Sequence, residues 1–119
     1  MPELTGSQLI MIRKQVSDGV PLEELLLSQF PDATIAIIRG FDNLSEEPYN
    51  KGAYFDERRA VEAMAEIPPN GTLPDTYHIV TCTVSDLSCR RILDMRTEDP
   101  LDEVDVSMAY ASLRERLFE

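Results

Sequence analysis

Apolar side chains recur at helical spacing near the start of the chain and predict a first helix there. Leu9, Ile12 and Val16 lie three or four residues apart, so they would share one face of a helix. Thr5 and Gln8 have the spacing of a capping box, in which each side chain hydrogen-bonds the other residue's backbone N–H. The pattern therefore predicts a helix that begins near Thr5.

Two more helices are predicted to follow. Pro21 suits the first turn of a helix, and the leucines and the phenylalanine of residues 22–30 form its apolar stripe. Asp32 can cap a third helix over residues 33–39, and Gly40 would end that helix because glycine accepts the left-handed backbone conformation. The first 41 residues are thus expected to form a three-helix lobe.

The middle of the chain mixes turn residues, one helix and one strand. Residues 42–54 are typical of a turn-rich connector, and residues 56–67 predict a fourth helix that begins near Asp56. Residues 77–84 are rich in β-branched and aromatic side chains, which predicts a strand. Its partner stays open, because residues 89–96 could form the other arm of a hairpin or a helix; in the second case the strand pairs elsewhere, for instance across a dimer.

Residues 97–100 predict the start of the last helix, with Asp99 as its cap, and the helix should run to about Phe118. Its apolar residues form two stripes, which is a wider apolar face than one neighbour covers. The first stripe consists of Val104, Met108, Ala111 and Phe118, and the second of Val106, Tyr110, Leu113 and Leu117. We expect the second stripe to form the interface of a homodimer, unless the N-terminal lobe folds back over it.

Together these elements predict a mainly α fold with a minor β part. Residues 1–41 would form the three-helix lobe, and residues 42–119 an acidic α+β part packed on it, in one compact domain. A chain of 119 residues suits a single domain. Its content of 43% hydrophobic and 28% charged residues speaks against a disordered chain.

The charge of the chain is strongly one-sided. Twenty-two acidic residues stand against eleven basic ones, which gives a net charge of −11 and a pI near 4.4. Such an excess repels nucleic acid and anionic membranes and attracts basic surfaces; it also fits a plain solubility role or a salt-adapted host. No leader segment and no apolar run of about 20 residues is found, so we expect a cytoplasmic protein without membrane contact.

Side chains that carry catalysis or bind metals are scarce. Cys82 and Cys89 lie seven residues apart, which fits no common zinc motif, and we expect both to be reduced thiols. The single histidine, His78, leaves little for a metal cluster or a catalytic triad. The five glycines are scattered and form no phosphate-binding loop. We therefore expect no catalytic residue, no metal and no cofactor.

One segment carries a family resemblance. The run GVPLEELLLSQFPDATIAIIRG resembles the helix-turn-helix of the trihelical domains found in resolvases and many small regulators. Those motifs often end in a β-branched residue, two variable residues and then Ile-Arg-Gly, as residues 35–40 do here. The resemblance implies a DNA-binding transcriptional regulator. The residues that would contact DNA are Thr34, Arg39, Arg13 and Lys14.

The chemistry of the expected third helix argues against a DNA reader. Its outward positions would be Ala33, Thr34, Ala36 and Ile37, whereas base edges are read mainly by Arg, Lys, Asn and Gln. An outward Ile37 beside two alanines suits a dry protein contact better. Direct binding of nucleic acid is therefore not expected.

The favoured function is that of a small acidic, non-enzymatic regulator or inhibitor that acts through protein–protein contacts. Its partner would present a basic surface, and that surface could be a nucleic-acid-binding groove that the acidic protein covers as a mimic of DNA. A helix-turn-helix DNA-binding regulator is the alternative. The expected partner-binding residues are Asp99, Asp102, Glu103, Asp105, Ala33 and Ile37.

Overall fold

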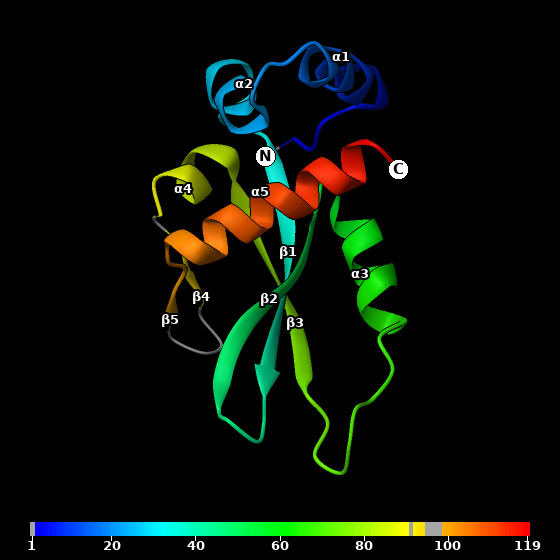
Figure 1. The fold of residues 1–119 in the computed structure, drawn as a ribbon, viewed down its shortest axis with the longest axis vertical. Helices are drawn as coiled ribbons and strands as arrows, with labels where there is room; N and C mark the ends of the chain where they lie inside the picture. Colours follow the sequence, from blue (N-terminus) through cyan, green and yellow to red (C-terminus); the bar gives the residue numbers. More distant parts are fainter. Residues whose placement is uncertain (1, 91, 95–98) are drawn as a thin grey trace.

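The chain folds as an α+β domain in a computed structural model that describes residues 2–90, 92–94 and 99–119. Its helices and strands alternate along the chain rather than falling into separate regions (Figure 1). In order, they are α1 (Gly6–Ser17), α2 (Leu22–Gln29), β1 (Thr34–Asp42), β2 (Glu47–Tyr54), α3 (Glu57–Ala65), β3 (Thr76–Thr83), α4 (Val84–Ser88), β4 (Leu93–Asp94), β5 (Asp99–Pro100) and α5 (Glu103–Leu117).

A three-stranded antiparallel sheet organises the domain, in the order β2-β1-β3. Helix α5 crosses one side of the sheet and α3 lies on the other, while α1 and α2 cover one end (Figure 1). The prediction of a mainly α fold with one short β element is therefore wrong, because a three-stranded sheet lies at the centre of an α+β domain. The boundary expected between residues 41 and 42 falls inside β1.

The expected third helix of the N-terminal lobe is the central strand β1. Ile35 and Ile37 face the main core beneath α5, whereas Ala36 and Ile38 face a second apolar cluster with Ala60 of α3. A strand buried on both faces carries no polar positions, so its sequence shows no alternation. A short apolar run of this kind does not by itself distinguish a helix from a buried strand.

The expected connector at residues 42–54 contains strand β2. Its pairing with β1 is interrupted by a bulge, because Ile38 is opposite Gly52 while Arg39 is opposite Asn50. The backbone N–H of Ala53 donates to Ser112 Oγ of α5 at 2.8 Å, and Ser112 Oγ donates to the Ala53 carbonyl oxygen at 3.3 Å. Helix α5 thus satisfies backbone groups on the outer edge of β2, which a fourth strand would otherwise use.

Several predicted elements are confirmed. The capping box of α1 is present, with Gln8 N donating to Thr5 Oγ1 at 3.2 Å and Thr5 N donating to Gln8 Oε1 at 2.8 Å. Helix α2 begins directly after Pro21, and α3 begins after Asp56, whose side chain accepts from Arg59 N at 2.6 Å. Strand β3 lies within one residue of the predicted strand.

Helix α5 begins later than predicted and packs differently. Its cap is Asp102, in a capping box with Asp105, rather than Asp99, which belongs to β5. Residues 97 and 98 of the predicted helix start lie outside the described part of the chain. The stripe predicted as a dimer interface consists of Val106, Tyr110, Leu113 and Leu117, which are 0–8% exposed. These side chains pack in the domain's own core, where α5 covers one face of the sheet, which the sequence analysis did not predict. The assignment of this stripe to a dimer interface is therefore wrong.

The described residues of 89–96 form neither a helix nor a hairpin with β3. Helix α4 ends at Ser88, and a two-residue strand, β4, follows at residues 93–94 and pairs with β5. Residues 91, 95 and 96 lie outside the described part. The partner of β3 is instead β1, in an unbroken register from Thr34 opposite Thr83 to Phe41 opposite Thr76.

Candidate functional site

The predicted acidic partner-binding cluster is largely occupied by local structure. Asp102 and Asp105 hydrogen-bond each other's backbone N–H groups at the start of α5. The Asp105 carboxylate also accepts from Arg39 Nη1 at 3.2 Å. Glu103 is exposed, and Asp99 lies in β5 with its side chain outside the described part. Among the described side chains of this cluster, only the exposed carboxylate of Glu103 takes no part in these hydrogen bonds.

The two apolar residues predicted to touch a partner are buried. Ala33 is 6% exposed and Ile37 is fully buried in the main core. Both were expected on the outer side of a helix, but Ile37 belongs to the central strand and Ala33 directly precedes it. Their assignment to a partner surface is therefore wrong.

The residues expected to contact DNA do not form one surface. Arg39 is 1% exposed and donates to Asn50 Oδ1 and Asp105 Oδ1, while Asn50 Nδ2 donates to the Asp105 carbonyl oxygen at 2.8 Å. This buried network ties β1 and β2 to α5 and holds the Arg39 guanidinium away from any phosphate. Arg13 and Lys14 are exposed on α1.

The hydrogen-bonding direction of strand β1 can be read from two backbone contacts. Val84 N donates to the Ala33 carbonyl oxygen at 3.0 Å, so the backbone groups of Ala33 point toward the β3 side. Thr34 N donates to the Pro2 carbonyl oxygen at 3.1 Å, so the next residue points to the opposite side. In an antiparallel pair, bonded and non-bonded residue pairs alternate along the strands. The odd-numbered residues of β1 therefore bond to β3.

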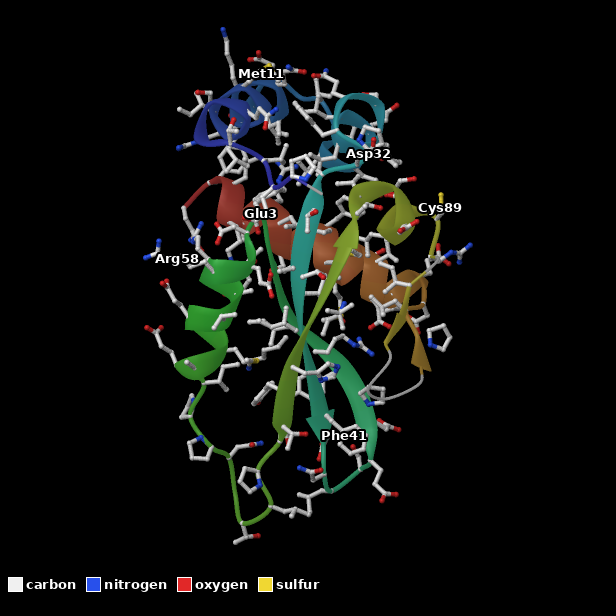
Figure 2. All side chains as sticks on the ribbon, turned by 180° about the vertical axis from the view of Figure 1, so that it is seen from behind. Glu3, Met11, Asp32, Phe41, Arg58 and Cys89 are labelled. Atoms are coloured by element: carbon white, nitrogen blue, oxygen red, sulfur yellow. The ribbon has the colours of Figure 1, made fainter. Side chains whose placement is uncertain are left out.

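The same alternation fixes which backbone groups of β3 point away from the sheet. Ile37 is opposite Val80, so Val80 bonds to β1, and Tyr77, Ile79 and Thr81 direct their N–H and C=O groups outward. The outward groups of Ala53, on the far edge of the sheet, agree with this phase. Strand β3 is the last strand of the sheet on this side among the described residues. In Figure 2, which views the domain from behind, β3 crosses in front of β1 near the middle of the sheet.

The sequence of β3 lacks the usual protection of a free edge. Natural sheets guard their edge strands with lysine, proline or bulges, or cover them with other elements. Strand β2 has such features, namely Pro48, Lys51 at its bulge, and the hydroxyl of Ser112 from α5. The β3 sequence TYHIVTCT contains no Lys, Arg, Asp, Glu or Pro, and its register with β1 is unbroken. We call the outward backbone groups of Tyr77, Ile79 and Thr81 the β3 edge.

An open hollow of about 430 Å³ lies at one end of the β3 edge. It is lined by threonines and by the carboxylates of two residues from neighbouring helices, Glu57 of α3 and Asp86 of α4. The carboxylate of Glu3 is close to Glu57, because its Oε2 accepts from Glu57 N at 2.7 Å. The hollow therefore presents negative charge next to the outward backbone groups of the β3 edge.

The chemistry of the hollow does not support a nucleophile. The Cys82 thiol lies in its lining, and burial, with a smaller contribution from the Asp86 carboxylate, raises the pKa of Cys82 to about 12. A thiol with such a pKa stays protonated at neutral pH, and the thiolate is the reactive form. Over the described ranges, no three His, Cys, Asp or Glu side chains are placed to hold a metal ion.

Sequence reasoning identified β3 but not the role of its edge. The strand was visible from its composition, whereas its position at the end of the sheet depends on β1, which was taken for a helix. The available signals were the uncharged sequence of β3 and the fact that no partner strand was predicted for it.

None of the helices in the described part of the chain is long and apolar enough to cross a lipid bilayer. No known protein family, curated protein or solved structure matches this chain.

Proposed function

We propose that this protein is a non-enzymatic regulator that binds an extended, basic segment of a partner protein as an added strand on the β3 edge. The observation that carries the proposal is the free edge of β3, with its uncharged, proline-free sequence. Edge addition is a common mode of peptide recognition, in which main-chain hydrogen bonds supply affinity and side-chain pockets supply specificity.

The charge of the chain supports a basic partner rather than a second copy. Two copies paired along their β3 edges would each bring a net charge of −11 to the contact, and like charges repel. A Lys or Arg side chain from an added strand could instead reach the carboxylates of Glu57 and Asp86 in the hollow. Complementary charge of this kind raises the rate of association and fixes the register of the added strand.

The expected affinity is modest. Tyr77, Ile79 and Thr81 each offer one N–H donor and one C=O acceptor, and a neutral hydrogen bond contributes about 1 kcal/mol net. Part of this gain is offset by the loss of freedom on association. We therefore expect dissociation constants in roughly the high-micromolar to millimolar range, and binding should weaken with added salt.

Such binding would also cover the basic residues of the partner. Basic segments commonly serve nucleic-acid binding, where Lys and Arg neutralise phosphates. An acidic protein that occupies them competes with nucleic acid, which is an inhibitory mode of regulation.

Thr81→Pro tests the proposal with little damage to the fold. The Thr81 side chain is exposed and its N–H points outward, so proline would remove an edge donor but no bond to β1. Thr81→Val is the matched control, because it keeps the N–H and removes only the hydroxyl. The probe is a labelled eight-residue peptide of alternating valine and lysine, with a valine-glutamate peptide as its charge-reversed counterpart.

Fluorescence anisotropy should show binding of the lysine peptide to the wild type and to Thr81→Val, and at least tenfold weaker binding to Thr81→Pro. Hydrogen exchange should show that the amides of Ile79 and Thr81 are exposed in the free protein and become protected in the complex. Val80 should be protected in both states. Equal binding by a folded Thr81→Pro variant, or slow exchange of Ile79 and Thr81 in the free protein, would refute the edge as the binding site. If the edge does bind the lysine peptide, co-purification from the native host would identify the natural partner.

A further inference from the structure

Helix α1, the start of α3 and the end of α5 meet at one corner of the domain (Figure 1). Arginine side chains from all three helices make contacts there. Arg13 of α1 and Arg114 of α5 both lie over the ring of Phe118, with their guanidinium carbons 5.6 and 5.9 Å from its centre. These distances are in the range of cation–π contacts. A single aromatic ring therefore holds two cations from different helices at this corner.

A second ring holds two further arginines of the same corner. The guanidinium carbon of Arg116 lies 4.6 Å from the centre of the Tyr54 ring, and that of Arg59 lies 6.0 Å from it. Four of the eleven basic residues of the chain thus converge here, although acidic residues outnumber basic ones two to one. We call Arg13, Arg59, Arg114 and Arg116 the arginine cluster.

A small cavity of about 160 Å³ opens among three of these arginines. Arg13, Arg59 and Arg116 line it together with apolar side chains, among them Phe55 and Leu117. The share of liquid volume per water molecule is about 30 Å³, so the cavity holds roughly five water-sized groups. That is room for a charged head group and a short apolar stem rather than for a whole large ligand.

A carboxylate of the chain itself, that of Glu119, already binds two arginines of the cluster. Glu119 Oε2 accepts from Arg59 Nη2 at 2.6 Å, and its other oxygen accepts from Arg116 Nη1. The hydrogen bonds from Arg116 and Arg59 lower the pKa of Glu119. Across the described residues, Arg116 Nε is buried without a hydrogen-bond acceptor. Glu119 therefore shows that two arginines of the cavity wall bind a carboxylate together, and it leaves the Nε donor of Arg116 unused.

A structural ion pair alone does not explain so many cations. One exposed carboxylate needs one or two arginines, and such a pair contributes little to stability. Glu119 pairs with Arg59 and Arg116, whereas the contact of Arg13 and Arg114 is the ring of Phe118 rather than this carboxylate. Arginine is also the side chain best suited to bind planar or tetrahedral oxyanions with two parallel hydrogen bonds.

We propose that the arginine cluster is a binding site for an oxyanion head group, a carboxylate or a phosphate on a short apolar stem, and that Glu119 is its internal stand-in. The incoming oxyanion displaces the Glu119 side chain and takes over its hydrogen bonds to Arg59 and Arg116. The apolar part of the cavity wall receives the stem. This site is separate from the β3 edge and does not depend on the function proposed above.

The probes are benzoate and phenyl phosphate, which separate the two sources of oxyanion, with benzyl alcohol as the uncharged counterpart. Binding is followed by NMR titration of the arginine Nε–H signals and by calorimetry. Glu119→Gln removes the competing charge and should tighten binding of at least one probe by about 2–5-fold, the equivalent of an exposed ion pair. Glu103→Gln makes the same charge change at the other end of α5 and should leave binding unchanged.

Arg59→Ala should weaken binding of the same probe at least tenfold. Arg58→Ala is its matched control, because Arg58 is the adjacent residue of α3 but its side chain is 88% exposed and pairs with Glu62. Far-ultraviolet circular dichroism checks that each variant is folded. Equal effects of Arg58→Ala and Arg59→Ala, weaker binding to Glu119→Gln, or no shift of any arginine signal with either probe at about 10 mM would each overturn the proposal.

Discussion

Gly40→Ala should destabilise the domain severely, because a tyrosine ring lies directly on this glycine. Gly40 is opposite Tyr49 of β2 and Tyr77 of β3 on the central strand. A Cβ atom at Gly40 would stand 2.4 Å from Cζ of Tyr49 and 2.8 Å from both of its Cε atoms. Real Cβ atoms do not come so close to neighbours, so the Tyr49 ring must move.

The Tyr49 ring is held in place at its far end. Its hydroxyl donates to Asp75 Oδ2 at 2.6 Å and lies 3.2 Å from the Tyr77 hydroxyl. Burial, and then these hydrogen bonds, raise the pKa of Tyr49, so the phenol stays protonated as the donor. Overpacking costs about 1–3 kcal/mol, and a lost hydrogen bond adds about 1 kcal/mol. We therefore expect Gly40→Ala to lower the free energy of unfolding by about 2–4 kcal/mol.

Urea denaturation measures this loss, and thermal unfolding should show a fall in Tm of roughly 8–16 °C. Gly52→Ala in β2 is the matched control, because its new Cβ would meet Tyr54 and Ser112 at ordinary contact distances of 3.6 and 3.7 Å. It should change stability by no more than about 0.5 kcal/mol.

The double variant isolates the clash from the general effect of alanine in a strand. When Tyr49 is replaced by alanine, the space above Gly40 is empty, and Gly40→Ala should then stabilise the strand by about 0.5 kcal/mol, since glycine is unfavourable there. The sign of the Gly40→Ala effect thus reverses between the two backgrounds. An equal loss of stability in both backgrounds would refute the account of a Tyr49 clash.

Three further outcomes are expected. Ellman's reagent at about pH 8 should react with exposed Cys89 in the folded protein and with Cys82 only after denaturation, because burial raises the pKa of Cys82 to about 12. Backbone N–H bonds from Leu44 and Ser45 lower the pKa of Asp42 below its ordinary 3.8, so their stabilising effect is present above that pH and is lost as the pH falls through the folded-state pKa. Urea midpoints between about pH 5 and pH 2 should therefore fall less for Asp42→Asn than for the wild type. Anisotropy at physiological salt should detect no duplex DNA binding tighter than roughly micromolar, and tight, sequence-selective binding would contradict the expectation that this acidic chain does not bind nucleic acid.

The elements that were predicted correctly from the sequence are determined by interactions between residues close together in the chain. The Thr5–Gln8 capping box, the Asp56 cap and Pro21 each act on backbone groups within a few residues, so a short window of sequence is sufficient to place a helix start. Strand β1 depends on distant partners instead. Its isoleucines are buried by helices on both faces and by strands on both sides, and a window of residues 33–40 contains none of those neighbours.

Strand β2 was missed for the opposite reason. Pro48, Asn50 and Gly52 are poor strand formers, and the strand exists because β1 pairs with it and Ser112 of α5 caps its outer edge. Once β1 and β2 are unknown, α5 has no sheet to cover, and its buried stripe looks like a dimer interface. One wrong element thus produced the errors in both the fold class and the predicted interface.

The two proposed sites were beyond sequence reasoning to different degrees. Strand β3 was visible as a strand, and its lack of charge was visible too, but its place at the edge follows only from the strand order. The arginine cluster has no sequence signal. Arg13, Arg59 and Arg116 are more than forty residues apart along the chain, and the arginines in the last turn of α5 have a sufficient local reason in the helix dipole.

The first turn of α3 connects the two proposed sites. Glu57 lines the acidic hollow beside β3, and Arg59, two residues later, lines the oxyanion cavity. Residues two apart point to different sides of a helix, so one turn can serve two surfaces of opposite charge. The cap that fixes this turn is Asp56, whose carboxylate accepts from Arg59 N at 2.6 Å. Because the helix keeps these opposite charges apart rather than paired with each other, we expect each to serve its own ligand: the carboxylate a basic strand, and the guanidinium, once Glu119 is displaced, an oxyanion.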